Sequence, residues 1–218
     1  WQGCHPLIIP AIFAHAPYTC SNTTLRRAKE LALSQRVPLF IHVAETAGEQ
    51  GLIAEPQGPT PLAHLHNLGL LDRETVCVHG VWQSDADIDL LAASGASLIS
   101  CPQSNAKLAS GRAPLPAMVE RGVRLGVGTD GAASGNSLDL FREMGFAACL
   151  HKLPSGDATA MPARAVLSLA TSGSAEALGF DTGLGALRIG APADIILVDH
   201  QQSHLQPWHD ASVLVYSD

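Results

Sequence analysis

Strand-like and helix-like segments alternate along almost the whole chain, and this alternation constrains the fold more than any other feature of the sequence. The apolar runs at residues 7–13, 39–43, 75–79, 97–101 and 124–128 are short and typical of buried parallel strands. Turn or helix signals follow these runs, as they do in right-handed βαβ units. The sequence therefore predicts an α/β protein in which helices cover a parallel sheet.

Several helix starts can be predicted from polar residues that would accept hydrogen bonds from the first free backbone N–H groups. The predicted caps are Ser21 or Asn22, Thr60, Ser84 and Asn136. Ser84 is followed three residues later by Asp87, which is the spacing of a capping box.

The five predicted strands are too few to close an eight-stranded barrel. The fold class that fits is a partial (β/α)8, TIM-type barrel, in which residues 1–180 are the C-terminal portion and the first strands lie upstream. The strongly β-forming runs at residues 193–198 and 213–216 predict that residues 181–218 are part of a small β domain.

Charge and composition exclude several classes of partner. The 218 residues carry a net charge of −7, so no basic surface for nucleic acid or an anionic membrane is expected. No apolar run approaches the roughly 18 residues of a membrane span, and the first residues lack the features of a secretory signal. Five scattered cysteines without a Cys-x-x-Cys pair predict no disulfide framework. We therefore expect a cytoplasmic protein, and whether it forms a homo-oligomer stays open.

Residues that bind metals or move protons occur at the carboxyl ends of three predicted strands, where a parallel barrel carries its active site. His42 shares a strand face with Phe40 and is expected to point toward the barrel axis. A neutral imidazole is the commonest metal ligand, and a carboxylate such as Glu45 in the following loop can carry a proton to a leaving group. Alone, this pair also fits a buried structural histidine and a solvated glutamate.

His79 and Asp130 extend the pattern to two further strands. Gly126 and Gly128 share a face with Asp130 and are expected to leave room for a ligand or metal above the barrel core. An Asp-Gly pair is also typical of a plain turn, and His79 could be a hydrogen-bonded core histidine. Three separate strands that end in His, His and Asp are rarer by chance than any one of them, which favours a hydrolytic metal site.

His64 and His66 have the spacing by which a strand would place two ligands side by side. They lie in the helix predicted after Thr60, however, where residues two apart diverge around the axis. We interpret them as surface or helix-packing histidines.

Several segments resemble motifs of the amidohydrolase superfamily, in the branch of aminohydrolases that includes chlorohydrolases and nucleobase deaminases. They are His42-Val-Ala-Glu45, Val78-His-Gly-Val-Trp82, Cys101-Pro-Gln-Ser-Asn105 and Gly128-Thr-Asp-Gly-Ala-Ala-Ser134. Residues 15–21, 136–141, 192–199 and 204–207 resemble the 5'-methylthioadenosine/S-adenosylhomocysteine deaminases of that branch. The resemblance covers essentially the whole chain. It implies metal-dependent hydrolytic deamination of a 6-aminopurine nucleoside, a small-molecule substrate, through activated water.

The resemblance also implies a role for each matching residue. His42 and Asp130 would be ligands of one divalent metal, with zinc preferred and iron or manganese also suited to such ligands. Glu45 would carry protons and contact the purine edge, and His79 would orient the water or the tetrahedral intermediate. Asp130 would also accept a proton from the attacking water, and His15 would contact the ribose.

One part of the family pattern is missing. Members of the superfamily carry a His-x-His pair at the end of the first barrel strand, and no strand-borne His-x-His occurs in this sequence. A catalytic zinc site needs about three protein ligands. The chain alone is therefore expected to bind metal poorly and to need an N-terminal half of the barrel from the same gene product. The alternatives are another hydrolase on this scaffold, such as a guanine or cytosine deaminase or a triazine chlorohydrolase, or a catalytically incomplete chain.

Overall fold

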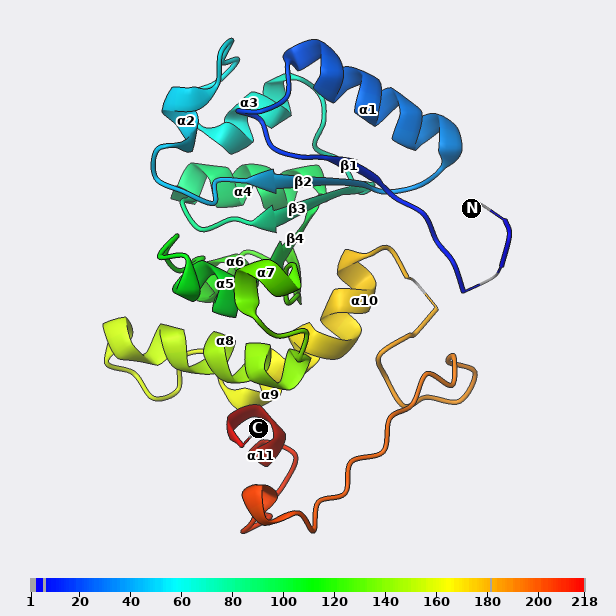
Figure 1. The fold of residues 1–218 in the computed structure, drawn as a ribbon, viewed down its shortest axis with the longest axis vertical. Helices are drawn as coiled ribbons and strands as arrows, with labels where there is room; N and C mark the ends of the chain where they lie inside the picture. The colour runs from blue at the N-terminus through cyan, green and yellow to red at the C-terminus, as the bar shows by residue number, and fades with distance from the viewer. Residues whose placement is uncertain (1–2, 6, 181, 218) are drawn as a thin grey trace.

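A sheet of five parallel strands forms the centre of the computed structural model, which describes residues 3–5, 7–180 and 182–217 (Figure 1). The strands lie side by side in chain order as β1 (Ile12–Ala14), β2 (Leu39–Val43), β3 (Thr75–His79), β4 (Ser97–Ser100) and β5 (Arg124–Val127). At least one helix joins each strand to the next, because parallel neighbours need a crossover connection. The predicted α/β class is confirmed, although β1 is shorter than the predicted run at residues 7–13.

Helices pack mainly against one face of this sheet, and further helices follow β5 in the chain. They are α1 (Asn22–Gln35), α2 (Glu49–Leu52), α3 (Pro61–Asn67), α4 (Asp85–Ser94), α5 (Pro102–Lys107), α6 (Leu115–Glu120), α7 (Ala132–Gly135), α8 (Leu140–Ser155), α9 (Ala163–Ser168), α10 (Ser174–Ala177) and α11 (Val213–Tyr216). A π-helical turn, η1 (Leu169–Gly173), joins α9 to α10, and a 3-10 turn, η2 (Ser203–Leu205), lies in the tail.

Most of the predicted helix caps are present. The side chains of Ser21, Thr60 and Ser84 each accept a backbone N–H from the first turn, and Ser84 forms the full capping box. The predicted cap at Asn136 is wrong, because that residue ends α7 in a left-handed conformation. Asp139 caps α8 instead, since its Oδ1 accepts the Phe141 N–H at 2.9 Å.

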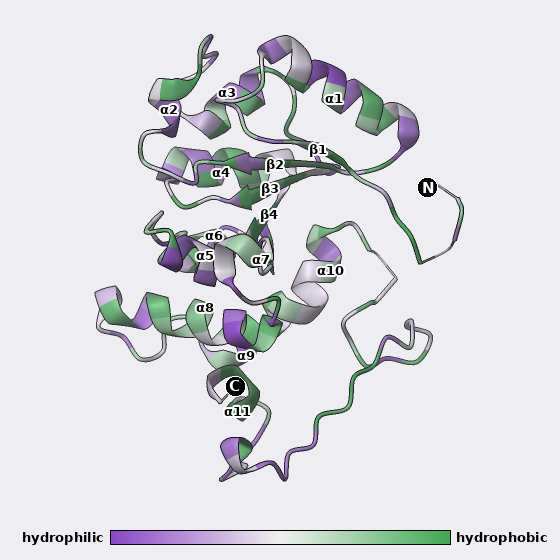
Figure 2. Ribbon diagram, viewed as in Figure 1, coloured by the Kyte–Doolittle hydropathy of each residue, from purple (hydrophilic) through white to green (hydrophobic). Residues whose placement is uncertain are grey.

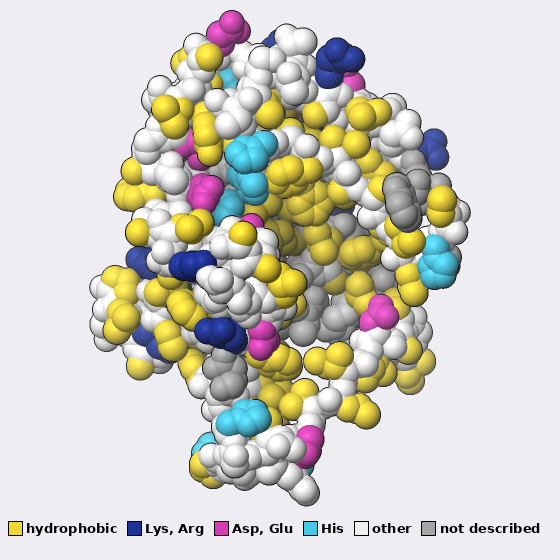
Figure 3. Space-filling model, in the orientation of Figure 1, with side chains coloured by type: hydrophobic (Ala, Val, Ile, Leu, Met, Phe, Trp, Pro, Cys, Tyr) yellow, Lys and Arg dark blue, Asp and Glu magenta, His cyan; other side chains and the backbone are white. Residues whose placement is uncertain are grey.

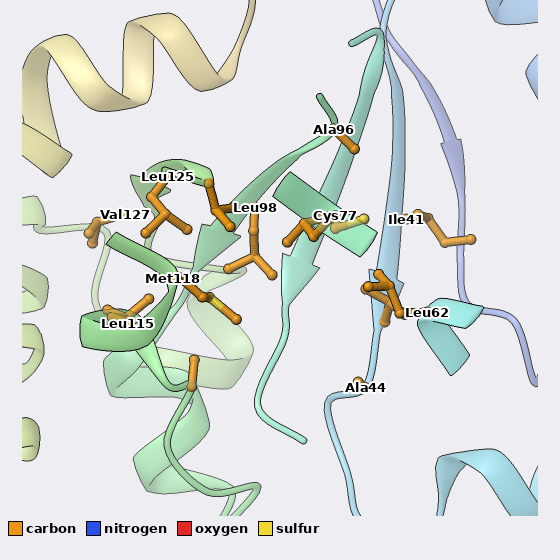
Figure 4. Close-up of a cluster of buried hydrophobic side chains, with 14 of the residues drawn as sticks. Ile41, Ala44, Leu62, Cys77, Ala96, Leu98, Leu115, Met118, Leu125 and Val127 are labelled. Carbon is orange, nitrogen blue, oxygen red and sulfur yellow. The ribbon is translucent and has the colours of Figure 1, made fainter. Parts of the chain in front are cut away.

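One face of the sheet is buried beneath helices. Ile41, Cys77 and Leu98 have no exposed surface, and Figure 4 shows them in one cluster with Leu62 of α3 and Met118 of α6. Removing this apolar face from water is the dominant favourable contribution to holding the helices on the sheet.

The other face of the sheet is only partly covered. In-register pairing aligns Phe13 with Phe40, and His42 with Val78 and Ile99. Phe13 is 54% exposed and the other four are half-buried. Figure 3 shows hydrophobic side chains lining a hollow in the molecule. A closed barrel would bury such a face in its interior, so the five strands form part of an open barrel wall.

The tail beyond residue 180 differs from the predicted small β domain. Residues 193–198 have no regular structure, and residues 213–216 form α11, which packs against α8 and α9. Both runs are apolar (Figure 2), and Ile196 is 75% exposed. A strand requires a neighbouring strand for its backbone hydrogen bonds, and no strand of the described residues pairs with either run. The two predicted strands are therefore wrong, and the division of the chain near residue 180 stays a prediction.

Neither a disulfide bond nor a membrane-spanning helix occurs in the part of the chain that the structure describes. All five cysteines are free thiols. Burial raises the pKa of Cys77 to about 12, which makes this thiol unreactive at neutral pH. No helix among these residues is both long and apolar enough to cross a membrane.

Gly126 of β5 allows α10 to approach the sheet. A Cβ atom at this position would lie 2.7 Å from Cδ1 of Ile99 and 2.9 Å from Cα of Ser174. The Val127 N–H donates to Oγ of Ser174 at 3.1 Å, so α10 covers the edge of β5 that β4 does not pair.

The side chain of Ile99 also lies 2.9 Å from a Cβ built at Gly128. Ile99 and α10 therefore occupy the positions next to these two glycines, and the ligand space expected above the barrel core stays a prediction.

Replacing Gly126 with alanine should lower the free energy of unfolding by about 1–3 kcal/mol, because the new methyl group would overlap the backbone of α10. Urea unfolding followed by circular dichroism measures the change. Gly51→Ala is the matched control, since no atom lies within 4 Å of a Cβ at that helical position and alanine favours helix. Equal stability of the two variants would contradict the close packing at Gly126.

Candidate functional site

The carboxyl ends of four strands meet at one edge of the sheet and bring the predicted residues together. His15 follows β1, His42 lies on β2, His79 ends β3 and Asp130 follows β5. The ring centroid of His42 lies 5.1 Å from that of His15 and 5.0 Å from that of His79. Asp130 interacts electrostatically with both His42 and His79. Figure 3 shows histidine and acidic side chains gathered beside the apolar hollow.

Glu45 lies in the loop after β2 and faces His79. Its Oε2 is 3.9 Å from Nε2 of His79, and its Oε1 is 3.5 Å from Oγ of Ser110. The Glu45 side chain is 21% exposed while that of His79 is 2% exposed. Glu45 can therefore exchange protons with solvent or with a bound molecule while it remains beside a buried imidazole.

His15 and the two helical histidines occupy different surroundings. His15 is exposed, and its Nδ1 lies 2.8 Å from Oγ1 of Thr19. His64 is buried in α3 and accepts the Gln57 N–H at 2.9 Å, whereas His66 is exposed. The interpretation of His64 and His66 as helix-packing and surface residues is confirmed.

The electrostatic environment places His42 and Asp130 in the protonation states that bind metals. Burial lowers the pKa of His42, and the nearby His79 and His15 lower it further, so the imidazole is neutral at pH 7. Burial acts to raise the pKa of Asp130, but hydrogen bonds from the Ser104 hydroxyl and the Gly131 N–H outweigh it. The pKa of Asp130 is therefore below its usual value, and this carboxylate is ionised.

His42 and Asp130 are the right types of ligand for a zinc ion, but they are too few to hold it. A neutral imidazole and a carboxylate are both ordinary zinc ligands, and a catalytic site has about three protein ligands. Across residues 3–5, 7–180 and 182–217, no group of three His, Cys, Asp or Glu side chains is arranged to hold a metal. These residues can therefore supply one side of a metal site.

Helix α5 contributes two polar partners that the sequence analysis missed. The Ser104 hydroxyl donates to Oδ2 of Asp130 at 2.7 Å, and Nδ1 of His79 lies 2.8 Å from Oδ1 of Asn105. Both α5 side chains are buried. With Asn105 as the acceptor, Nδ1 of His79 carries a proton and Nε2 faces Glu45. The only sequence signal for these residues was their place in the segment Cys101–Asn105, which gave them no role.

The strand ends turn through left-handed backbone at three residues that carry side chains. The φ angles are 52° at Ala44, 73° at His79 and 59° at Asp130, in a region that such residues rarely adopt. The turn explains the position of His79. By strand alternation its side chain would follow Cys77 into the helical layer, and the positive φ redirects it to the edge of the sheet.

Glu49, the first residue of α2, is another buried polar residue that the sequence analysis missed. It is 1% exposed, and its Oε2 accepts the Glu45 N–H at 2.8 Å. Burial raises the pKa of Glu49 to about 6, although hydrogen bonds from the backbone at Ala44 and Glu45 act in the opposite direction.

The raised pKa of Glu49 should make stability depend on pH. The folded state binds this proton more tightly than the unfolded state, where the pKa of a glutamate is about 4.3. The folded state should therefore lose stability as pH rises toward about 6. The side chain in Glu49→Gln does not titrate. Between about pH 4.3 and pH 6 we therefore expect the free energy of unfolding of this variant to rise, relative to that of the wild type, by up to about 2 kcal/mol. Urea unfolding of both proteins between pH 4 and pH 7.5 measures the difference, and a pH-independent difference would contradict this assignment.

An open wall of parallel strands with histidine and carboxylate side chains at its carboxyl edge is typical of a metal-assisted barrel hydrolase. The model of the amidohydrolase family matches residues 4–216, and the chain belongs to this family. The predicted family is therefore confirmed.

Proteins with similar sequences and structures cover nearly the whole chain. The 5-methylthioadenosine/S-adenosylhomocysteine deaminase of Syntrophobacter fumaroxidans is 47% identical over 213 residues, which are 97% of this chain and 49% of that protein. The 5'-deoxyadenosine deaminase of Methanosarcina mazei is 45% identical over 219 residues, which are 100% of this chain and 50% of that protein. A crystal structure of an adenosine deaminase from Xanthomonas campestris with bound zinc has a TM-score of 0.92 and 40% identity, and the match covers 99% of this chain and 49% of that one. The chain thus spans about half the length of these relatives.

Proposed function

We propose that this chain carries catalytic residues of a metal-dependent deaminase that acts on a 6-aminopurine nucleoside of the methylthioadenosine or adenosylhomocysteine type. One observation carries the proposal: Glu45 and His79 face each other at the sheet edge that also holds His42 and Asp130. Relatives named as deaminases of adenosine-type nucleosides support the substrate class.

We propose His42 and Asp130 as ligands of one divalent metal. The zinc-bound adenosine deaminase of similar fold supports zinc, while iron and manganese accept the same ligands. A zinc ion lowers the pKa of a water molecule that it binds to about 7, and this is the chemistry that it would supply.

The residues of the chain itself would orient the reactants and move the protons. Asp130 accepts the proton that the attacking water releases, and Nε2 of His79 accepts a hydrogen bond from the same water and so orients its oxygen toward the ring carbon. Glu45 contacts the purine edge and delivers a proton to the amine. The carbon–nitrogen bond then breaks, and its electron pair leaves with ammonia. His15, exposed at the same edge, would contact the ribose.

Glu45→Gln in the complete, zinc-loaded enzyme should keep zinc and bind the nucleoside, but kcat should fall by roughly 100- to 10,000-fold because no proton reaches the amine. Ammonia release and elemental analysis of zinc measure the two effects. Glu30→Gln, a change at an exposed acid of α1, is the control. Near-normal ammonia release by Glu45→Gln would refute the role of Glu45.

We propose that the open face of the sheet is completed by an N-terminal half of the barrel from the same gene product. Phe13 and its partly covered neighbours form an apolar surface, and the matched relatives are about twice as long as this chain. The same segment would supply the remaining metal ligands. A cytoplasmic location stays a prediction.

Zinc bound to the purified 218-residue chain should be well below one ion per chain, because about three protein ligands are needed. Adding the complementary half should raise the zinc content to about one ion. Elemental analysis after gel filtration measures both values, and His42→Ala should prevent the increase. Stoichiometric zinc in the isolated chain would contradict the incomplete ligand set.

A substrate panel separates this function from others on the same scaffold. Ammonia release from methylthioadenosine, adenosylhomocysteine, guanine and cytosine, and chloride release from a chlorotriazine, are compared for the complete enzyme. A preference for guanine, cytosine or the triazine would overturn the nucleoside assignment.

A further inference from the structure

Glu49 is a buried carboxylate that the proposed reaction does not use. It is 1% exposed, and the salt bridges found between described residues do not include it. A buried charge without an opposite charge is unfavourable unless hydrogen bonds stabilise it. The groups that stabilise Glu49 therefore indicate what it does.

Backbone N–H groups next to Glu45 provide this stabilisation. Oε2 of Glu49 accepts the Glu45 N–H at 2.8 Å, and hydrogen bonds from the backbone at Ala44 and Thr46 also favour the ionised form. Successive N–H groups that face one point form an anion-binding nest. In this chain the anion is the side chain of Glu49.

The nest includes an unfavourable backbone conformation. Ala44 has a φ angle of 52°, which a residue with a side chain rarely adopts. Such a conformation persists only where the surrounding structure holds it. Glu45 follows directly, so the direction in which its side chain leaves the backbone depends on this turn.

The carboxylate of Glu45 has little else to fix its position. Its contacts with described residues are long, at 3.9 Å to Nε2 of His79 and 3.5 Å to Oγ of Ser110. Neither contact is short enough to be a strong hydrogen bond. The placement of this side chain therefore depends mainly on its backbone.

We propose that Glu49 is a positioning residue for Glu45, and that its carboxylate holds the turn at residues 44–46 so that the Glu45 side chain faces His79. The proposal rests on the proposed function, in which Glu45 carries protons. Glu49 itself touches neither the substrate nor the reacting atoms in this scheme.

Three substitutions separate positioning from a role of charge. Glu49→Gln keeps the size of the side chain and one oxygen acceptor, and Oε1 of Glu49 has no hydrogen-bond partner among the described residues that an amide would disturb. Glu49→Met keeps the size but removes every acceptor. Glu49→Asp keeps the charge but shortens the reach by one methylene group.

We expect kcat for ammonia release by the complete, zinc-loaded enzyme to fall roughly 10- to 100-fold in the Met and Asp variants. The Gln variant should stay within about threefold of the wild type, and KM and zinc content should be unchanged in all three. Glu55→Met, at an exposed acid just beyond α2, is the control. Loss of activity in Gln equal to that in Met would overturn the proposal in favour of a role of charge. A folded Met variant with wild-type kcat would also overturn it, because neither the hydrogen bonds nor the charge of Glu49 would then matter. If Met does not fold, the opposite ranking, Asp near wild type and Gln low, overturns it.

Amide hydrogen exchange at Glu45 and Thr46, measured by NMR on the 218-residue chain, is independent of activity. Exchange should be slow in the wild type and Gln variant and fast in the Met and Asp variants. Equal exchange rates in all four proteins would overturn the proposal. A wild-type enzyme that releases no ammonia would refute the proposed function instead, and the exchange rates would still decide whether Glu49 holds the backbone of Glu45.

Discussion

Parallel pairing of neighbouring strands is the interaction on which the rest of this structure depends. The five strands are hydrogen-bonded in chain order, with His42, Val78 and Ile99 in register. Because parallel strands all end at the same edge of a sheet, residues that follow different strands meet there without being near in sequence. A shift of β2 by one residue would turn His42 into the helical layer, so the register itself determines whether the site exists.

In the proposed function, the open face of the sheet and the small number of metal ligands have the same cause. His42 shares its face with Val78 and Ile99, and this is the face that helices leave partly uncovered. A segment that covered the face would therefore also bring its own side chains to the edge where His42 and Asp130 lie. The chain spans about half the length of its matched relatives, which agrees with a further segment of the protein that covers this face.

Features that depend on neighbouring residues could be predicted from the sequence, and features that depend on tertiary contacts could not. The caps at Thr60 and Ser84 need only residues within one turn, and both are present. Ser104 is 26 residues from Asp130, its hydrogen-bond partner, and no local pattern marks such a pair. The strand predicted at residues 193–198 is absent because it too depends on a tertiary contact: β-forming residues make a strand only beside another strand.

The conformation of each strand end depends on short helices that local signals did not predict. Left-handed backbone at Ala44, His79 and Asp130 is unfavourable, and a buried polar side chain contacts each of these turns. Glu49 of α2 binds the backbone around Ala44, while Asn105 and Ser104 of α5 bind His79 and Asp130. The strand ends bring the reactive side chains to one edge, but α2 and α5 determine where those side chains point. A sequence that kept every motif at the strand ends and lost these partners would place the same residues without their orientation.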